Sequence, residues 1–517
     1  MQKEIVMKKN LSIVIYRRMI LVILILFIQV VFLALLVAVP GIYFRYVNIF
    51  LIIISIIVSI HVLNKNTKAA YKLTWIFIVL LFPVFGGIMY MFFYLQANPR
   101  RFRRLIEQNI SNSQSALQLC ANRLDELIEK HPEFKTQSGY LQEFAGFPVF
   151  SNTRTHYFDS GEAFFKQTLI ELEKAQRYIF LEFFILEEGL MLDPIISILE
   201  RKAKEGLDVR LIYDDFGCIT SLPSDFKTNM EKKGIKCFIF NPFRPLLSSL
   251  QNNRDHRKII SIDGKVAFTG SMNIADEYIN AVDRFGHWKD AAIMLEGEGA
   301  WAFTMIFLQM WNTQPGIYDR YVSYFPWADA PCNIEGDGFV QPYADSPVDH
   351  ENVSENVYIQ IINNAKKYVY INTPYLILDD NLLGALQLAA KSGVDVRIIT
   401  PHRWDKWYVA VTSRSYYRQL ISAGVKVYEY TLGFNHGKTF ACDDAIATVG
   451  TTNLDYRSLY LHFECGVVVY HGKAVLDLKD DFLRTIPVSH EISLKDCSRN
   501  IFQIILSDVL RIFAPLM

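Results

Sequence analysis

An internal repeat constrains the fold of this 517-residue chain more than any other feature of its sequence. In each copy an apolar strand pattern, at residues 178–181 and again at 368–371, precedes a helical pattern and then a second strand. The second strand is entered through the same residues, Gly-x-Asp-Val-Arg, and the offset between the copies stays near 190 residues. Strands that alternate with helices predict α/β units around a parallel or mixed sheet. The sequence therefore predicts two tandem α/β units that arose by duplication.

Each copy ends in the same set of polar residues. A histidine is followed by a lysine two residues later, by an aspartate five residues beyond the lysine, and then by Gly-Ser/Thr-x-Asn. One such match can arise by chance in a chain of this length, but two matches at the same place in a repeat indicate a functional site. The predicted catalytic residues are His256, Lys258 and Asp263 in the first copy and His436, Lys438 and Asp443 in the second.

The spacing of histidine and lysine suits chemistry at a phosphodiester. Side chains alternate along a strand, so the histidine and the lysine of each motif face the same way. Two such strands facing one another would place two imidazoles and two ammonium groups in one pocket, where they can neutralise a phosphate. One imidazole can attack phosphorus while the other protonates the leaving alkoxide. The predicted substrate-binding residues, as neutral donors to the phosphate oxygens, are Ser271, Asn273, Thr451 and Asn453.

The same motif argues against a metal centre. Each histidine has a lysine on its own face, so a second cation there would be costly, and no carboxylate cluster offsets the charge. The reaction is predicted to need neither a metal nor a cofactor. Asp214-Asp215 resembles a metal-binding pair only weakly and is predicted to cap the following turn. The seven cysteines are scattered without a C-x-x-C pair, which indicates reduced thiols in a reducing compartment.

The first hundred residues are typical of a multi-pass membrane anchor. Apolar runs cover residues 19–39, 47–63 and 73–95, and the first run is about long enough to span the hydrocarbon core of a bilayer. A secretory signal peptide is the rival interpretation of that run, but no small-residue cleavage site follows it. The whole chain is 51% hydrophobic, which also favours a membrane protein.

The orientation of the anchor is less constrained. The basic residues at positions 8–18 indicate a cytoplasmic N-terminus, and three full crossings would then place the rest of the chain outside. However, basic residues flank both ends of the third run, and Pro83 with Gly86-Gly87 could turn that run into a re-entrant hairpin. A catalytic domain on the cytoplasmic side is favoured.

These features divide the chain into four parts. Residues 1–99 form the transmembrane anchor and residues 100–145 a helical linker, while residues 146–330 and 331–517 form the two α/β units of one bilobal catalytic domain. The 53 basic residues are balanced by 53 acidic ones, so the chain lacks the positive charge that marks a nucleic-acid-binding protein. No nucleic acid is expected as a partner.

The paired motif resembles that of the phospholipase D superfamily, and the residues around it resemble bacterial cardiolipin synthases. The matching segments are residues 253–260, 262–265, 268–270, 273–278 and 288–290 in the first copy and 373–375, 413–417, 427–430 and 453–458 in the second. The hydrophobic N-terminal hairpin and the amphipathic C-terminus fit the same family. Three departures bear on acceptor preference and leave every reacting group in place: Gly437, Ser271-Met272 and an extra N-terminal apolar segment.

The resemblance implies a covalent mechanism. One of His256 and His436 becomes the phosphatidyl-enzyme, and the other acts first as general acid and then as general base. Lys258 and Lys438 hold the phosphate.

The resemblance also bears on four acidic residues. Asp263 and Asp443 complete the catalytic motif as orienting or structural groups, because strand parity turns them away from the lysines. Glu464 and Asp290 are predicted to hydrogen-bond the histidines and to fix their tautomers. Surface salt bridges are the alternative interpretation of these last two.

The implied reaction joins two phosphatidylglycerol molecules into cardiolipin and releases glycerol, with these lipids and the bilayer as partners. Hydrolysis to phosphatidic acid, or transfer to another lipid or alcohol, uses the same intermediate and depends on whether the pocket excludes water. A nuclease shares the motif but fits the anchor and the neutral charge poorly. A catalytically silent membrane scaffold would have no use for two intact His-Lys pairs. The sequence sets no expectation for oligomeric state.

Two further segments bear on the membrane. Trp404, Trp407 and Tyr408 alternate with basic residues, which suits either the headgroup level of a bilayer or ordinary loop packing. Apolar residues recur at helical spacing across residues 501–513. This pattern predicts a helix that docks on the core, in preference to a helix on the membrane surface.

Overall fold

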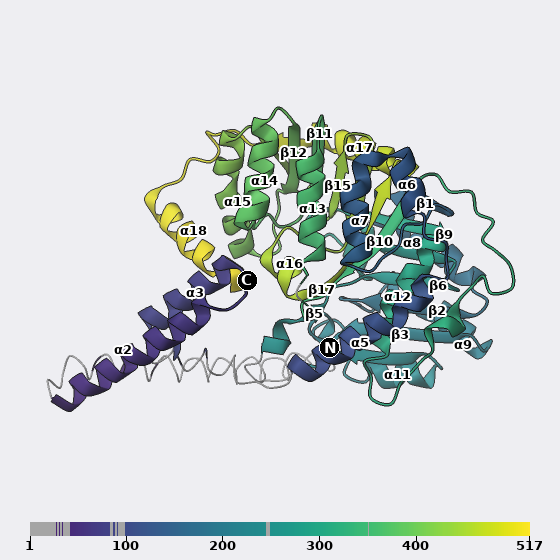
Figure 1. Cartoon of the computed structure of the whole chain (residues 1–517), viewed down its shortest axis with the longest axis horizontal. Coiled ribbons are helices and arrows are strands. Elements are labelled where there is room, and N and C mark those ends of the chain that lie inside the picture. The colour runs from purple at the N-terminus through teal and green to yellow at the C-terminus, as the bar shows by residue number, and fades with distance from the viewer. Residues whose placement is uncertain are drawn as a thin grey trace.

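The computed structural model describes residues 27, 30, 31, 34, 42–82, 86, 87, 90, 99–243, 249–349 and 351–516. Two mixed sheets with their covering helices form the body of the molecule, and a pair of helices projects from it near the C-terminus (Figure 1). All seven cysteines lie within the described residues and none is paired, as the sequence predicts.

The first sheet belongs to the first predicted unit. Its parallel strands β2, β3 and β4 are β-branched and aromatic, and they continue into antiparallel strands on the other side of β2. The strand order is β1 (Thr153–Phe158), β9 (Ala292–Gly297), β7 (Val266–Gly270), β6 (Ile259–Ile262), β2 (Tyr178–Phe183), β3 (Asp208–Asp214) and β4 (Lys236–Phe240). Its helices include α8 (Gly161–Lys174), α9 (Leu192–Lys204), α10 (Asp215–Cys218) and α11 (Phe226–Lys232).

The second sheet repeats that order strand for strand and adds one edge strand. The order is β10 (Phe339–Asp345), β17 (His462–Tyr470), β16 (Ile446–Gly450), β15 (Thr439–Cys442), β11 (Tyr368–Asn372), β12 (Asp395–Pro401), β13 (Lys426–Tyr430) and β18 (Ser489–Glu491). Its helices include α13 (Val353–Asn364), α14 (Asp380–Lys391), α15 (Trp407–Ser422), α16 (Tyr456–Tyr460) and α17 (Lys473–Thr485). The repeat predicted from sequence is therefore a structural duplication.

Two short strand pairs cross from one unit to the other. Strand β5 (Arg254–Asp255) pairs in parallel with the start of β17, and β14 (Gly433–Asn435) pairs in parallel with β8 (His287–Lys289). Each pair joins the segment just before a histidine motif to a strand of the opposite unit. These crossed pairs bring the two motifs together.

Helix α12 (Glu298–Trp311), in which every residue is buried, packs against the first sheet and against β10 of the second. Helix α5 (Pro99–Leu117) lies against α12, and the Asn109 amide donates to the Gln309 carbonyl over 3.0 Å. Helices α6 (Leu124–Lys130) and α7 (Lys135–Glu143) follow α5. Residues 100–145 are thus largely helical and pack on the catalytic body.

The structure describes part of the predicted membrane anchor. Helix α2 (Ile42–Leu63) contains the one segment of the described residues, Arg45–Leu63, that is long and apolar enough to cross a membrane. Helix α3 (Ala69–Leu81) is apolar but only 13 residues long. The first predicted run falls almost wholly outside the described residues, as does the end of the third. A multi-pass anchor is therefore not established, and one candidate span is what the described residues support.

The C-terminal helix α18 (Ile501–Phe513) docks on α15, as expected, but it does so mainly through its polar side and not through its apolar face. Ser507 is the one buried residue of this helix, and it receives a hydrogen bond from Arg499. Most of its apolar side chains point outward instead, and Phe502 is 80% exposed, whereas Leu510 and Phe513 are half-buried. Helix α18 lies beside α3, where the Thr74 hydroxyl donates to the Ile512 carbonyl over 2.7 Å (Figure 1). Amphipathic spacing indicates that a helix has an apolar face and a polar face, but it does not indicate which of the two packs against the protein.

Candidate active site

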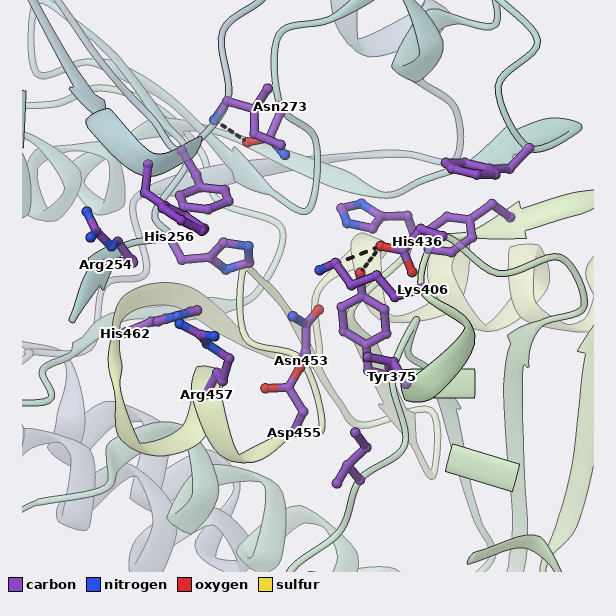
Figure 2. Close-up of a pocket in the computed structure, with 18 of the residues that line it drawn as sticks. Arg254, His256, Asn273, Tyr375, Lys406, His436, Asn453, Asp455, Arg457 and His462 are labelled. Atoms are coloured by element: carbon purple, nitrogen blue, oxygen red, sulfur yellow. Dashed lines mark hydrogen bonds and ion pairs between the residues drawn. The ribbon is translucent and has the colours of Figure 1, made fainter. Parts of the chain in front are cut away.

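Each motif histidine is fixed by a backbone hydrogen bond to the opposite unit. The His256 amide donates to the Phe463 carbonyl over 2.9 Å, next to the pairing of β5 with β17. The His436 amide donates to the Lys289 carbonyl over 2.7 Å, next to the pairing of β14 with β8. Both histidines line one cavity of about 390 Å³ between the two units (Figure 2). The predicted meeting of the two motifs is confirmed.

The acid that holds each histidine also comes from the opposite unit. His256 Nδ1 lies 2.9 Å from Glu464 Oε1, and His436 Nδ1 lies 2.8 Å from Asp290 Oδ2. Both carboxylates are fully buried. The Nδ1–H group donates to the carboxylate, which leaves Nε2 of each ring as the reactive atom. The predicted hydrogen bonds of Glu464 and Asp290 to the histidines are confirmed, and the alternative of surface salt bridges is wrong.

Ser271 and Thr451 contact the acids that hold the histidines, whereas the sequence predicts that they contact the phosphate. The Ser271 hydroxyl donates to Asp290 and the Thr451 hydroxyl donates to Glu464, and a backbone carbonyl is a second acceptor within reach of each. With these bonds made, neither hydroxyl is available as a phosphate donor. The two residues position the acids instead, because a rigidly held carboxylate orients the histidine beside it.

The lysines lie beside their own histidines, as strand parity predicts. Lys258 Nζ donates to the His256 carbonyl over 2.5 Å, and Lys438 Nζ donates to the His436 carbonyl over 2.9 Å. Lys438 Nζ also lies 3.1 Å from His436 Nε2. Both lysines are buried, with 2% of each residue exposed.

Asp263 and Asp443 lie in a structural position, which agrees with their expected orienting or structural role and separates them from the reacting groups of the motif. Each sits in the turn after its strand with a left-handed φ, 54° and 55° respectively. The Asp263 carboxylate accepts three backbone N–H bonds of 2.8 Å from residues 176–178. The Asp443 carboxylate accepts three, of 2.6–2.8 Å, from residues 366–368. Both acids therefore fasten the far ends of β6 and β15, away from the cavity.

The two motif asparagines do line the cavity. Asn273 uses both ends of its amide, accepting from the Ile185 amide over 3.0 Å and donating to the Tyr278 hydroxyl over 2.7 Å. Asn453 donates to the Ser458 hydroxyl over 3.0 Å, and its buried Oδ1 has no hydrogen-bond partner within the described chain. An amide oxygen is an acceptor, so this end of Asn453 suits a donor group of the substrate and not a phosphate oxygen.

Burial, and after it the neighbouring cations, sets the protonation of the site. Burial, followed by the neighbouring lysines, holds the pKa of His256 well below its ordinary value and lowers that of His436 to about 4. Burial also lowers the pKa of Lys258 to about 8 and that of Lys438 to about 7. Burial tends to raise the pKa of Asp290, but His436 and Lys438 hold it below its ordinary value. The resting site therefore holds neutral imidazoles beside cations that stay charged up to about neutral pH.

Several cavity residues were not anticipated from the sequence. Besides the motifs, Arg254, Lys406, Arg457 and His462 line the cavity, with Tyr375 and Asp405 linked by a 2.6 Å hydrogen bond (Figure 2). They lie outside the repeated motif, although Arg254, Tyr375 and Arg457 fall within the segments that resemble cardiolipin synthases. The expected capping role of Asp214 is confirmed, since its carboxylate accepts from the Phe216 and Gly217 amides at 2.8 and 3.1 Å.

Two groups of side chains among the described residues have the spacing of a metal site, and one of them lies at the cavity. Ligand atoms of His256, His462 and Glu464 all lie within 4.8 Å of one another. Glu464 is engaged with His256 and Thr451, and Lys258 raises the local positive charge. This donor set is therefore a poor match for a cation, because a bound ion would have to displace hydrogen bonds that orient His256.

Comparison with known proteins agrees with this geometry. The family described as "Cardiolipin synthase, PLD-like domain" matches residues 169–296 and 358–486, and the phospholipase D-nuclease N-terminal family matches residues 53–93. A cardiolipin synthase of Halalkalibacterium halodurans is 33% identical over 479 residues, covering 91% of this chain and 93% of that protein. The chain belongs to the cardiolipin synthase family. It is thus a phosphatidyltransferase of the phospholipase D superfamily.

Other relatives of this cardiolipin synthase family member extend the comparison. An uncharacterized protein of Streptococcus mutans is 43% identical over 460 residues, which cover 89% of this chain and 99% of that one. The crystal structure of a phosphatidylserine synthase from Haemophilus influenzae aligns with a TM-score of 0.55 at 14% identity, over 74% of this chain and 98% of that chain. At that identity the likeness supports the fold alone, two α/β units of the phospholipase D type.

Proposed function

We propose that this enzyme transfers a phosphatidyl group from one phosphatidylglycerol molecule to another, forming cardiolipin and glycerol through a covalent phosphohistidine. One observation carries the proposal: two histidines, each held by a buried acid of the opposite unit, line the same cavity beside two buried lysines. That arrangement supplies a nucleophile, a general acid and a cationic phosphate site in one place.

In the first step, Nε2 of one histidine attacks phosphorus, and the P–N bond forms as the P–O bond to the glycerol headgroup breaks. The second histidine gives its proton to the departing alkoxide. Both imidazoles are neutral at rest, because burial and the lysines lower their pKa. A bound phosphate diester places negative charge among these cations, which raises the pKa of the acid histidine and lets it carry the proton.

In the second step, the neutral imidazole takes the proton of a hydroxyl from the second phosphatidylglycerol. The oxygen of that hydroxyl attacks phosphorus, and the P–N bond breaks to release cardiolipin. Lys258 and Lys438 neutralise the phosphate oxygens in both steps. Ser271 and Thr451 act at one remove by holding the acids.

We propose that the enzyme works at the membrane, with its catalytic body on the cytoplasmic side. Helix α2 supplies one apolar span, and α3 and α18 add apolar surface next to the body of the molecule. Trp404 and Trp407 are about half exposed, and Lys406 between them lines the cavity. Exposed indole rings suit the headgroup level of a bilayer. The unpaired thiols support a reducing compartment.

The test uses purified protein in detergent micelles, with phosphatidylglycerol as the sole lipid and products followed by mass spectrometry. Cardiolipin and equimolar glycerol are expected, and both are lost in the His256→Ala and His436→Ala variants. Phosphatidic acid as the main product would replace the transferase by a hydrolase. No turnover of phosphatidylglycerol, with or without other acceptors, would overturn the proposed substrate. A parallel arm with EDTA tests the expected independence from metals, since chelation should leave the rate unchanged.

A further inference from the structure

At one matched position the two halves of the cavity carry side chains of different chemistry. Trp288 and His462 each lie two residues before the acid of their unit, on the strands that cross between the units. Trp288 packs beside His436 with ring centroids 5.3 Å apart, and its Nε1 donates to Asp290 over 3.1 Å. His462 packs beside His256 with ring centroids 5.4 Å apart. His462 Nδ1 is 3.8 Å from Glu464 Oε1, which is too long for a hydrogen bond.

His462 is therefore a buried polar side chain without a satisfied polar atom. Its side chain is 10% exposed, and neither ring nitrogen has a hydrogen-bond partner within the described chain. A buried donor or acceptor without a partner costs stability, so such groups are rare unless something else satisfies them. Both the ring and the Asn453 Oδ1 atom, which also lacks a partner, face the same cavity (Figure 2).

The chemistry of these groups points to a ligand that is not the phosphate. Burial lowers the pKa of His462 to about 3, with Arg457 and His256 also lowering it and Glu464 opposing them. The ring is therefore neutral and offers one N–H donor and one nitrogen acceptor. Together with an amide oxygen, it presents two acceptors and one donor. Phosphate oxygens are acceptors and already have two lysines, whereas alcohol hydroxyls both donate and accept.

We propose that His462, with Asn453, forms a hydroxyl-binding subsite that selects a polyhydric alcohol, the glycerol headgroup, as the leaving or attacking group. The proposal rests on the phosphatidyl transfer described above and adds a specificity-determining residue to it. Phosphorus sits between His256 and His436 during transfer, and the outer hydroxyls of glycerol lie only a few bonds from the ester oxygen. His462, whose ring packs beside His256 and lines the same cavity, lies on the side of the site where one of them would bind.

The test is a competition between two alcohols for one phosphatidyl-enzyme. Purified enzyme receives phosphatidylglycerol with isotopically labelled glycerol and ethanol at equal concentration. Mass spectrometry then gives the ratio of labelled phosphatidylglycerol to phosphatidylethanol. The single hydroxyl of ethanol becomes the ester oxygen on phosphorus, so ethanol has no further hydroxyl that could bind the subsite. The variants are His462→Phe, which removes both hydrogen-bonding atoms, and His462→Asn, which keeps a donor and an acceptor. His490→Phe, at a half-exposed histidine on the edge strand β18, is the matched control.

The wild-type enzyme is expected to prefer glycerol. His462→Phe should lower the glycerol-to-ethanol ratio by about fivefold, the worth of roughly one hydrogen bond, with phosphatidylethanol formation changed by less than about twofold. His462→Asn should keep most of the preference and His490→Phe all of it. An unchanged ratio in His462→Phe, or an equal loss of both products, would overturn the subsite. Failure of the wild-type enzyme to form either product would instead overturn the phosphatidyl transfer on which the subsite depends.

Discussion

The two halves of the cavity share their catalytic groups and differ in what surrounds them. Around His436 the neighbours are aromatic: the ring centroids of Trp288, Tyr278 and Phe434 lie 5.3, 5.5 and 5.8 Å from that of the imidazole. Around His256 they are mixed, with Phe184 at 5.0 Å and His462 at 5.4 Å.

This difference shows what duplication preserves and what it leaves free. Both units share the strand order and a histidine, a lysine and an acid at the cavity. These side chains are shared because the reaction at phosphorus needs all of them. A covalent mechanism then gives the two histidines different tasks, one on phosphorus and one on a proton. Different surroundings allow the same side chain to serve both tasks.

Replacing either histidine should have the largest effect. His256→Ala and His436→Ala are each expected to lower cardiolipin formation by about 10³-fold or more, because nucleophile and acid act as a unit. A rapid quench with radiolabelled phosphatidylglycerol separates the two tasks. One variant should form no labelled protein, and the other should retain the ability to form it. Substantial turnover in either variant would contradict two distinct tasks.

Neutralising the acids comes next, and the two halves should respond unequally. Glu464→Gln and Asp290→Asn are expected to lower kcat by about 10²–10⁴-fold, because each acid fixes a histidine tautomer. Asp290 should be the more sensitive, since it accepts from Trp288 Nε1 and His436 at one oxygen and from the Ala291 amide at the other. In Asp290→Asn, the new NH₂ group must replace one of these two oxygens, and at either place it would face an N–H donor that needs an acceptor.

At Glu464 the new amide can be accommodated, because Thr451 carries a hydroxyl that can turn to accept. Thermal unfolding should be recorded alongside the rates, as a control for folding. Equal losses of kcat in the two variants would show that the surroundings of the acids do not matter.

The lysines predict a pH dependence. Burial lowers the pKa of Lys438 to about 7 and that of Lys258 to about 8, so the charged forms that bind phosphate are lost as pH rises. The value of kcat/KM, which reports the free enzyme, should therefore fall above about pH 7 and fall more steeply above about pH 8. Lys438→Arg should move the first fall to higher pH, whereas Lys258→Arg should leave it in place. A flat profile from pH 6 to pH 9 in the parent enzyme would contradict this.

Replacing either of the two turn aspartates should have the smallest effect on kcat. The two replacements should lower stability by the same amount. Asp263→Asn and Asp443→Asn each weaken three backbone hydrogen bonds but keep a residue tolerant of a left-handed φ. Each is expected to lower Tm by about 2–4 °C, with kcat at low temperature changed by less than about twofold. Circular dichroism and the cardiolipin assay measure the two quantities. A large loss of kcat would return these acids to the catalytic machinery.

Much of the catalytic geometry was predictable because it is encoded in short, repeated spacing. The histidine and lysine of each motif sit two residues apart, and the repeat implied that two such pairs would meet. Residues whose place depends on contacts between the units were harder. Ser271 and Thr451 were expected at the phosphate, yet only the crossed strand pairs reveal that an acid lies between them and the site.

His462 shows a further limit of sequence reasoning. It lies outside the repeated motif, and its counterpart in the first unit is a tryptophan, so the repeat gives no signal for it. Helix α18 shows another, since amphipathic spacing did not reveal that the apolar face points away from the protein. In both cases the outcome depends on which other surface lies nearby, and local patterns do not contain that information.

The exchange of acids between the units has an evolutionary consequence. Each unit carries a histidine whose acid lies in the other unit, so one unit alone lacks a complete histidine–acid pair. A shorter ancestor with one motif would have needed a second copy of itself, related by a two-fold axis, to become active. Fusion of two such genes would have removed the dependence on concentration. It would also have freed each lobe to mutate without changing its twin.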